Sequence, residues 1–188
     1  MDSHGADTAR TPKARRTSQV RSGAPAVAVI MGSDSDLPKM QGCIDALREF
    51  DLAFEVAVIS AHRSPDLAHQ FARDAEGRGL RVIIAAAGGA AHLAGVIASL
   101  TTLPVIGVPI ASSALAGVDA LYSTVQMPPG VPVATVGIDA SRNAAILAAQ
   151  ILADRDNGLR GRLRTLKDSM ADAVTASNAT VRQKLGLK

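Results

Sequence analysis

The segment 60–66 places a histidine and an arginine side by side. This segment follows the apolar run Val56–Ile59 directly, so His62 and Arg63 lie where a buried strand meets the start of a helix. An imidazole can take or give a proton near neutral pH, and a guanidinium is a fixed positive charge suited to phosphate or carboxylate. A lone histidine can also be a structural hydrogen-bond partner, but beside Arg63 at a strand end we interpret His62 as an acid–base group.

A second polar segment follows the first apolar run, Ala26–Met31. Its side chains Ser33, Ser35 and Asp36 come just before a helical pattern. Such residues can simply cap the helix. Alternatively, the serine hydroxyls and the helix N-terminus hold a phosphate, and the carboxylate accepts ribose hydroxyls. The segment is neither a Walker A loop nor a GxGxxG fingerprint, so triphosphate hydrolysis is not predicted.

A third segment, 87–93, follows the run Val82–Ala87 and consists mostly of Gly and Ala. One interpretation is a tight turn with close backbone packing. The other is that small residues leave room for a ligand against bare N–H groups, with His92 at the rim. Because the carboxyl ends of parallel strands meet at one edge of a sheet, the three segments together predict a pocket for a small phosphorylated, sugar-like molecule.

Short apolar runs alternate with helical patterns along the chain. Continuous apolar strands separated by helices predict an α/β fold with a parallel sheet and helices on both faces. The predicted strands are Ala26–Met31, Phe54–Ile59, Val82–Ala87, Val105–Val108 and Val133–Val136, and the predicted helices are Leu37–Phe50, Ser64–Glu76, Ala91–Leu100 and Asn143–Ala153.

The last 30 residues predict an amphipathic helix beyond the last strand. Apolar residues recur at steps of three and four, at Leu159, Leu163, Leu166, Met170 and Val174. Such a stripe covers either the chain's own core or a neighbouring subunit, and the sequence leaves both open.

Composition and charge limit the class of protein. The net charge of +3 is accounted for by residues 1–24, which hold five basic and two acidic residues and read as a disordered basic leader. Residues 25–188 are predicted to form one α/β catalytic domain. The near absence of aromatics argues against binding of single-stranded nucleic acid, and no nucleic-acid partner is predicted. No segment has the pattern of a secretion signal or a membrane span, and the lone Cys43 excludes an internal disulfide and a cysteine metal site, which indicates the cytoplasm.

Four ordered motifs resemble one known family. They run from about Val27 to about Leu152 and are similar, in order and spacing, to the class I N5-carboxyaminoimidazole ribonucleotide mutases of purine biosynthesis. The motifs are Gly32–Asp36, Ser60–Asp66, Gly88–Leu93 and Gly117–Pro128. The resemblance implies a flavodoxin-like three-layer sandwich that assembles as a homo-octamer with sites at subunit junctions.

The resemblance also implies a role for each site residue. His62 would be the catalytic residue, and no metal or cofactor would be needed. Ser33 and Arg63 would hold the phosphate and Asp36 the ribose hydroxyls. The aminoimidazole would lie among Ser35, Ser60 and Ala61, and the migrating carboxylate among Ala87, Gly88, Ala90, His92 and Leu93.

Three other functions are weighed against this one. A direct aminoimidazole ribonucleotide carboxylase that uses carbon dioxide typically has an Ala-Gly-Arg-Ser-Asn loop where this chain has Gly88–His92. A non-catalytic sensor of a nucleotide or sugar phosphate would need Arg63 but not His62. Carboxylases that act on a pyridinium nucleotide precursor share such a domain but carry a larger N-terminal region.

Overall fold

The structure is a computed structural model that describes residues 24–112 and 114–187. The predicted leader 1–24 therefore lies outside the described residues except for Ala24. The strands are β1 (Val27–Met31), β2 (Phe54–Val58), β3 (Val82–Gly88), β4 (Val105–Ile110) and β5 (Ala134–Thr135). The α-helices are α1 (Leu37–Glu49), α2 (Pro65–Asp74), α3 (Leu93–Ala98), α4 (Val118–Val125), α5 (Ser141–Leu152) and α6 (Asn157–Lys184), with short 3-10 turns at Asp34–Asp36 and Ala153–Arg155.

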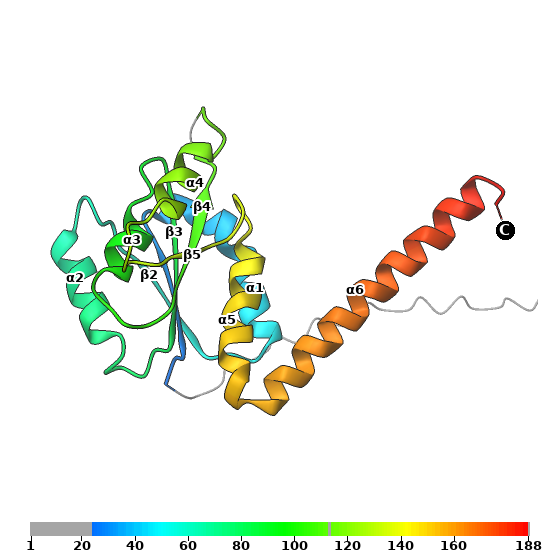
Figure 1. The fold of residues 1–188 in the computed structure, drawn as a ribbon, viewed down its shortest axis with the longest axis horizontal. Coiled ribbons are helices and arrows are strands. Elements are labelled where there is room, and N and C mark those ends of the chain that lie inside the picture. Colours follow the sequence, from blue (N-terminus) through cyan, green and yellow to red (C-terminus); the bar gives the residue numbers. More distant parts are fainter. Residues whose placement is uncertain (1–23, 113, 188) are drawn as a thin grey trace, which may run out of the picture.

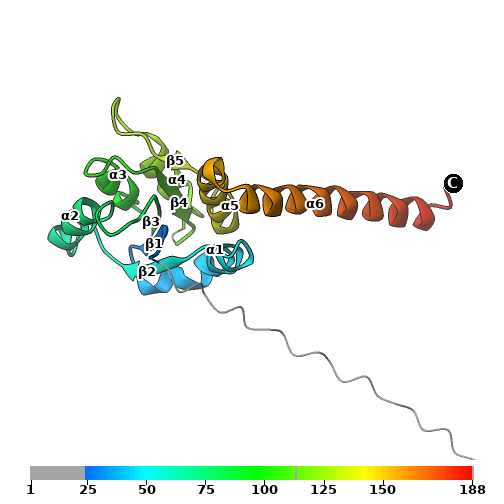
Figure 2. The same cartoon turned by 90° about the horizontal axis from the view of Figure 1, so that it is seen from below.

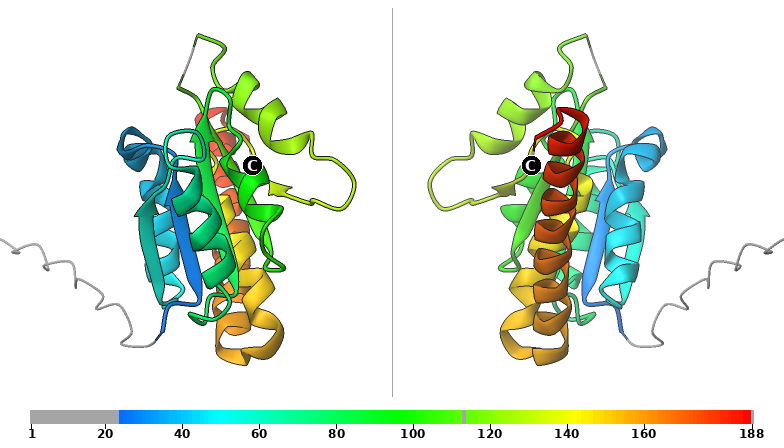
Figure 3. Two further views of the ribbon diagram at one scale, coloured as in Figure 1. Left: turned by 90° about the vertical axis from the view of Figure 1, so that its left-hand side faces the viewer. Right: turned by 90° about the vertical axis from the view of Figure 1, so that its right-hand side faces the viewer.

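The strands form one parallel sheet in the order β2-β1-β3-β4-β5. The apolar runs form its centre because β1 and β4 are buried along their whole length, as expected for strands covered on both faces. The sheet lies between α1 and α5 on one face and α2 and α3 on the other (Figures 1 and 3). The predicted three-layer, flavodoxin-like α/β fold is confirmed.

Successive residues of β1 point into two separate cores. Val27 and Val29 pack with α1, α5 and the start of α6, whereas Ala28 and Ile30 pack with α2 and α3. Glycine allows a close approach at Gly107 of β4, where a Cβ would lie 2.3 Å from the Thr124 Cγ2 of α4. Helix α4 therefore sits directly on β4. The segment between α4 and β5 loops out from the body (Figure 3).

Helix α6 packs on the body only through its first half. Leu159 is buried and Leu163 and Leu166 contact the core beneath α5, whereas Met170 and Val174 are exposed. The helix points away from the body along the rest of its length (Figures 1 and 2). The predicted stripe therefore covers the chain's own core for its first three leucines and leaves the remainder uncovered in this chain. Among the described residues, no helix is long and apolar enough to cross a membrane.

Candidate active site

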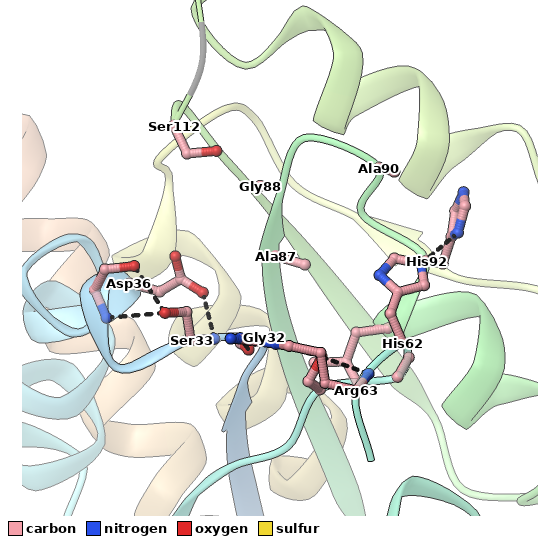
Figure 4. Close-up of a pocket in the computed structure, with 14 residues that line it drawn as sticks. Gly32, Ser33, Asp36, His62, Arg63, Ala87, Gly88, Ala90, His92 and Ser112 are labelled. Carbon is pink, nitrogen blue, oxygen red and sulfur yellow. Dashed lines mark hydrogen bonds between the residues drawn. The ribbon is translucent and has the colours of Figure 1, made fainter. Parts of the chain in front are cut away.

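A cavity of about 320 Å³ lies at the carboxyl ends of the strands. The strand order reverses between β1 and β3, so the loops that follow these two strands diverge and leave a crevice, which is where open α/β sheets bind ligands. Figure 4 shows the loops after four strands around this space. The lining residues are Gly32, Ser33, Ser35, Asp36, Ser60, Ala61, His62, Arg63, Ala87, Gly88, Ala90, His92, Leu93 and Ser112.

Every residue that the sequence placed in the site lines this cavity. Two further residues, Gly32 and Ser112, complete the lining. Ser112 was missed because the fourth strand was predicted to end at Val108, whereas β4 continues to Ile110. The available signal was its position: a serine follows the end of β4 closely, as Ser33 and Ser60 follow β1 and β2.

The loop after β1 is held by hydrogen bonds between its own polar groups. The Ser33 N–H donates to Asp36 Oδ2 over 3.1 Å, and the Ser35 N–H donates to Ser33 Oγ over 3.3 Å, which together form a capping box. The Ser35 hydroxyl lies 2.9 Å from that of Ser33. Burial raises the pKa of Asp36, the Ser33 hydrogen bond opposes this rise, and the charge of Asp34 adds to it. The two hydroxyls and the half-satisfied carboxylate are available to a ligand.

Arg63 is fixed between the loops after β1 and β2. Its Nη2 donates to the Gly32 carbonyl over 3.2 Å, and its Nε lies 3.4 Å from Ser60 Oγ (Figure 4). The Ser60 hydroxyl also accepts the backbone N–H of Arg63 over 3.2 Å. The guanidinium is thereby directed into the cavity next to Ser33, so a fixed positive charge and two hydroxyls surround a space suited to a phosphate.

The two histidines from separate loops form a pair. His62 Nε2 lies 2.9 Å from His92 Nδ1, and the rings meet edge to face with centroids 4.9 Å apart (Figure 4). One proton fits between two nitrogens at this distance, so one ring donates and the other accepts. Both side chains are exposed in this chain. The pair is able to hold and deliver a proton at the cavity rim.

The end of β3 and the start of the loop that follows shape the cavity wall by having only small residues. A Cβ on Gly88 would lie 2.0 Å from Ser112 Oγ and 3.1 Å from the Ile110 carbonyl, so no side chain fits there. Gly89 has a φ of 62°, which glycine adopts without strain. The wall therefore brings backbone and the methyl groups of Ala87 and Ala90 to the ligand space.

No metal-binding cluster is found in the described ranges 24–112 and 114–187, where no three His, Cys, Asp or Glu side chains gather. Cys43 is buried in α1 away from the cavity, and burial raises the pKa of its thiol to about 12. It is therefore a core residue and not a nucleophile.

The fold is a flavodoxin-like α/β fold, and the pocket at its switch point brings together an arginine, serine hydroxyls, a carboxylate and a pair of histidines. Residues 26–173 match the AIR carboxylase family. The chain belongs to this family.

Several named proteins are similar to this chain over most of its length. The N5-carboxyaminoimidazole ribonucleotide mutase of Pyrococcus abyssi is 56% identical over 151 residues, which are 80% of this chain and 87% of that protein. The enzyme of the same name from Mycobacterium leprae is 54% identical, over 85% of this chain and 93% of that protein. The phosphoribosylaminoimidazole carboxylase of Schizosaccharomyces pombe is 52% identical over 87% of this chain, but only 30% of that longer protein is covered.

A solved structure has the same fold. The crystal structure of Treponema denticola PurE superposes with a TM-score of 0.76 at 26% identity, over 84% of this chain and 99% of that one.

Proposed function

We propose that this protein is a mutase that moves the carboxylate of N5-carboxyaminoimidazole ribonucleotide from N5 to C4, the reaction of its named relatives in purine biosynthesis. The observation that carries the proposal is the paired imidazole of His62 at the rim of a cavity that also holds Arg63 and the Ser33–Asp36 loop. This combination of an anion anchor and an acid–base group suits an isomerisation that needs proton transfer and confinement.

We propose one orientation of the ribonucleotide, which matches the charged and polar groups that line the cavity. Its phosphate lies against Arg63 and Ser33, and its ribose hydroxyls donate to the carboxylate of Asp36. This direction places the aminoimidazole near Ser35, Ser60 and Ala61. The carboxylate then faces the wall formed by Ala87, Gly88, Ala90, His92 and Leu93.

The reaction proceeds by decarboxylation and recarboxylation. Protonated His62 gives its proton to N5 as the N5–carboxylate bond breaks, and the bonding electron pair stays on nitrogen while carbon dioxide is released. The electron-rich C4 then attacks carbon dioxide, and neutral His62 removes the C4 proton, which restores the aromatic ring. The imidazole that gives a proton to N5 takes one back from C4, so no proton is gained or lost overall. A well-placed acid–base group of this kind raises the reaction rate by about 10²–10⁴-fold. No cofactor enters these steps.

To retain carbon dioxide, the cavity must be closed to solvent, and a single chain does not close it. His62 and His92 are exposed in the single chain, so released carbon dioxide would escape before recombining. We propose that the enzyme works as a homo-octamer in the cytoplasm, with the sites closed at subunit junctions. Exposed apolar residues on α4 (Val118, Tyr122 and Val125) and on the outer half of α6 (Met170 and Val174) support an assembly between copies.

The assay that tests this function compares two substrates. The purified protein is incubated with N5-carboxyaminoimidazole ribonucleotide without bicarbonate, and the absorbance of the C4 product is followed. Rapid conversion supports the mutase. Conversion of free aminoimidazole ribonucleotide only at high bicarbonate would instead support a direct carboxylase. Binding of the ribonucleotide without any conversion would support a sensor.

Light scattering of the purified protein tests the assembly. A mass of eight chains supports the octamer, and replacement of Met170 and Val174 by serine is expected to reduce it. A stable monomer with full activity would contradict the proposed closure of the site.

A further inference from the structure

The segment after β5 continues along the edge of β4 by an unusual route. Strand β5 ends at Thr135, yet the Val136 N–H donates to the Gly107 carbonyl over 3.0 Å and the Asp139 N–H donates to the Pro109 carbonyl over 2.9 Å. In a regular parallel ladder, the residue that donates to Pro109 would also accept the Ala111 N–H through its own carbonyl. This second hydrogen bond, from the Ala111 N–H to the Asp139 carbonyl, is the one that the structure replaces.

The side chain of Asp139 takes the place of its carbonyl in this rung. Asp139 has a φ of 55°, in the left-handed region that aspartate tolerates better than most residues. Its carbonyl is turned away and accepts the Ser141 N–H at the start of α5 over 2.8 Å. Asp139 Oδ1 instead accepts the Ala111 N–H over 3.0 Å. One residue thus both extends the ladder along β4 and starts a helix.

The other carboxylate oxygen of Asp139 reaches the first turn of α1. Lys39 Nζ lies 2.5 Å from Asp139 Oδ2, and the Ser141 hydroxyl donates to the Lys39 carbonyl over 2.6 Å. The first turn of α1 directly follows the Ser33–Asp36 loop. Asp139 and Ser141 therefore connect two walls of the cavity from behind, and neither lines it.

The wall held by this connection carries Ser112. Ala111, whose N–H is bound by Asp139, precedes Ser112 in the chain, and the Ser112 hydroxyl faces the bare Gly88 at the cavity. We propose that Asp139 is a positioning residue that fixes Ser112 against the Ser33–Asp36 loop, so that the anchoring side of the pocket is preformed for the ribonucleotide. This proposal rests on the proposed function for its substrate.

Asp139 holds the wall mainly as a hydrogen-bond acceptor, and its negative charge contributes less. The side chains of Lys39 and Asp139 are 46% and 27% exposed, and ion pairs at such sites contribute little. The Ala111 N–H, in contrast, has the Asp139 carboxylate as its acceptor in a half-buried position. Asparagine keeps an acceptor oxygen and tolerates a positive φ, whereas glycine tolerates the φ and has no acceptor. Asp139→Asn therefore removes only the charge, whereas Asp139→Gly removes the charge and the acceptor, and neither variant adds backbone strain. Comparing the two variants isolates the effect of the acceptor.

The experiment compares the wild type with these two variants in the full chain. Amide hydrogen exchange at Ala111 is measured without ligand, and KM and kcat are measured with N5-carboxyaminoimidazole ribonucleotide. We expect Asp139→Gly to speed exchange at Ala111 and raise KM, each by up to about tenfold, the equivalent of one lost hydrogen bond. Its kcat should change by less than about twofold because His62 lies on another loop, and Asp139→Asn should stay within about threefold of the wild type in both readouts.

Several results would overturn the proposal. Unchanged exchange at Ala111 in Asp139→Gly would show that the side chain does not hold this rung. Faster exchange with an unchanged KM would make the contact merely structural. Equal damage in both variants would assign the effect to the charge. If the wild-type protein does not convert the ribonucleotide, the proposed function fails, and the exchange measurement still decides whether Asp139 holds the wall.

Discussion

The loops after β1 and β3 form opposite walls of one cavity by opposite means. In the loop after β1, Ser33, Ser35 and Asp36 bind one another through their side chains and backbone. At the end of β3 there is no space for a side chain at Gly88, and in the loop that follows, backbone contacts such as His92 N–H to the Ala90 carbonyl over 2.8 Å hold the turn.

The difference matches what each wall must do in the proposed reaction. A phosphate and a ribose need fixed hydrogen-bond partners, which are best supplied by side chains that already satisfy one another. A carboxylate that leaves one atom and rejoins another must stay close to its new position. A wall of small residues allows this because it packs closely around the reacting atoms. Substitutions that damage one wall should therefore affect binding, and those that damage the other should affect turnover.

The largest expected effect is on turnover, through His62→Asn. Asparagine keeps the polar side chain but cannot transfer a proton, so kcat should fall by about 10²–10⁴-fold. The dissociation constant of the ribonucleotide, measured by calorimetry, should change little because the anchoring wall is intact. His69→Asn, on the exposed face of α2 and outside the cavity, is the matched control and should keep full activity. Near-normal turnover of His62→Asn would remove this residue from the mechanism.

Arg63→Ala should have the opposite kinetic signature. Loss of a charged hydrogen bond to phosphate is expected to raise KM about ten- to hundredfold, with a much smaller change in kcat. Arg63→Lys should recover part of the loss, since it keeps the charge but not the contact to the Gly32 carbonyl. A fall in kcat with an unchanged KM would mean that Arg63 acts on the reacting atoms and not on the anchor.

The next substitution tests the bare wall directly. A Cβ at Gly88 would lie 2.0 Å from Ser112 Oγ, so Gly88→Ala should cost about 1–3 kcal/mol of stability. The control is Gly32→Ala in the opposite wall, where the nearest atom to a Cβ would lie 3.7 Å away, and we expect little change in its Tm. Addition of Ser112→Gly should restore part of the loss in Gly88→Ala. Equal Tm values for the two alanine variants would contradict the close approach of Gly88 and Ser112.

The sequence was sufficient to predict the walls because their residues follow strand ends. Apolar runs located the strands, and all parallel strands end at one edge of the sheet, so polar residues after these runs had to meet. Ser112 is the exception, because the apolar run Val105–Val108 predicts a strand that ends four residues before it, whereas β4 continues to Ile110. In the structure Pro109 lies inside β4. Its carbonyl accepts the Asp139 N–H, so its missing N–H faces the same edge of β4, beyond the end of β5, where proline is tolerated.

Two helices were harder to predict. Helix α4 was not predicted because its residues Val118–Val125 lie in a motif that entered the argument only through the resemblance. The amphipathic stripe of α6 was predicted, but the stripe alone does not show how far along the helix the core extends beneath it. Leu166 still contacts the core and Met170, one turn later, is exposed, because α5 and α1 offer no further surface beneath the helix. The position of Asp139 behind the site depends on a left-handed φ that no pattern indicates.

The smallest expected effect concerns the anchoring wall and has a defined sign with pH. Burial raises the pKa of Asp36 above its unfolded value of 3.8. An acid whose pKa is raised by folding lowers stability at any pH above its folded pKa, and this penalty is lost as the pH falls through the folded pKa toward 3.8. Asp36→Asn should therefore raise the Tm near pH 7, and the difference from the wild type should shrink on acidification in thermal unfolding scans.

The same substitution should weaken binding of the ribonucleotide. An amide oxygen is a poorer acceptor than a carboxylate for ribose hydroxyls, so KM should rise at the pH where the Tm rises. A variant that is more stable and binds less well would explain why a buried acid is kept in a loop whose serines alone could cap the helix. A lower Tm at pH 7 would show instead that the hydrogen bond from the Ser33 N–H outweighs the cost of burial. In that case the main role of the carboxylate is to hold the loop together, and another residue would have to bind the ribose hydroxyls.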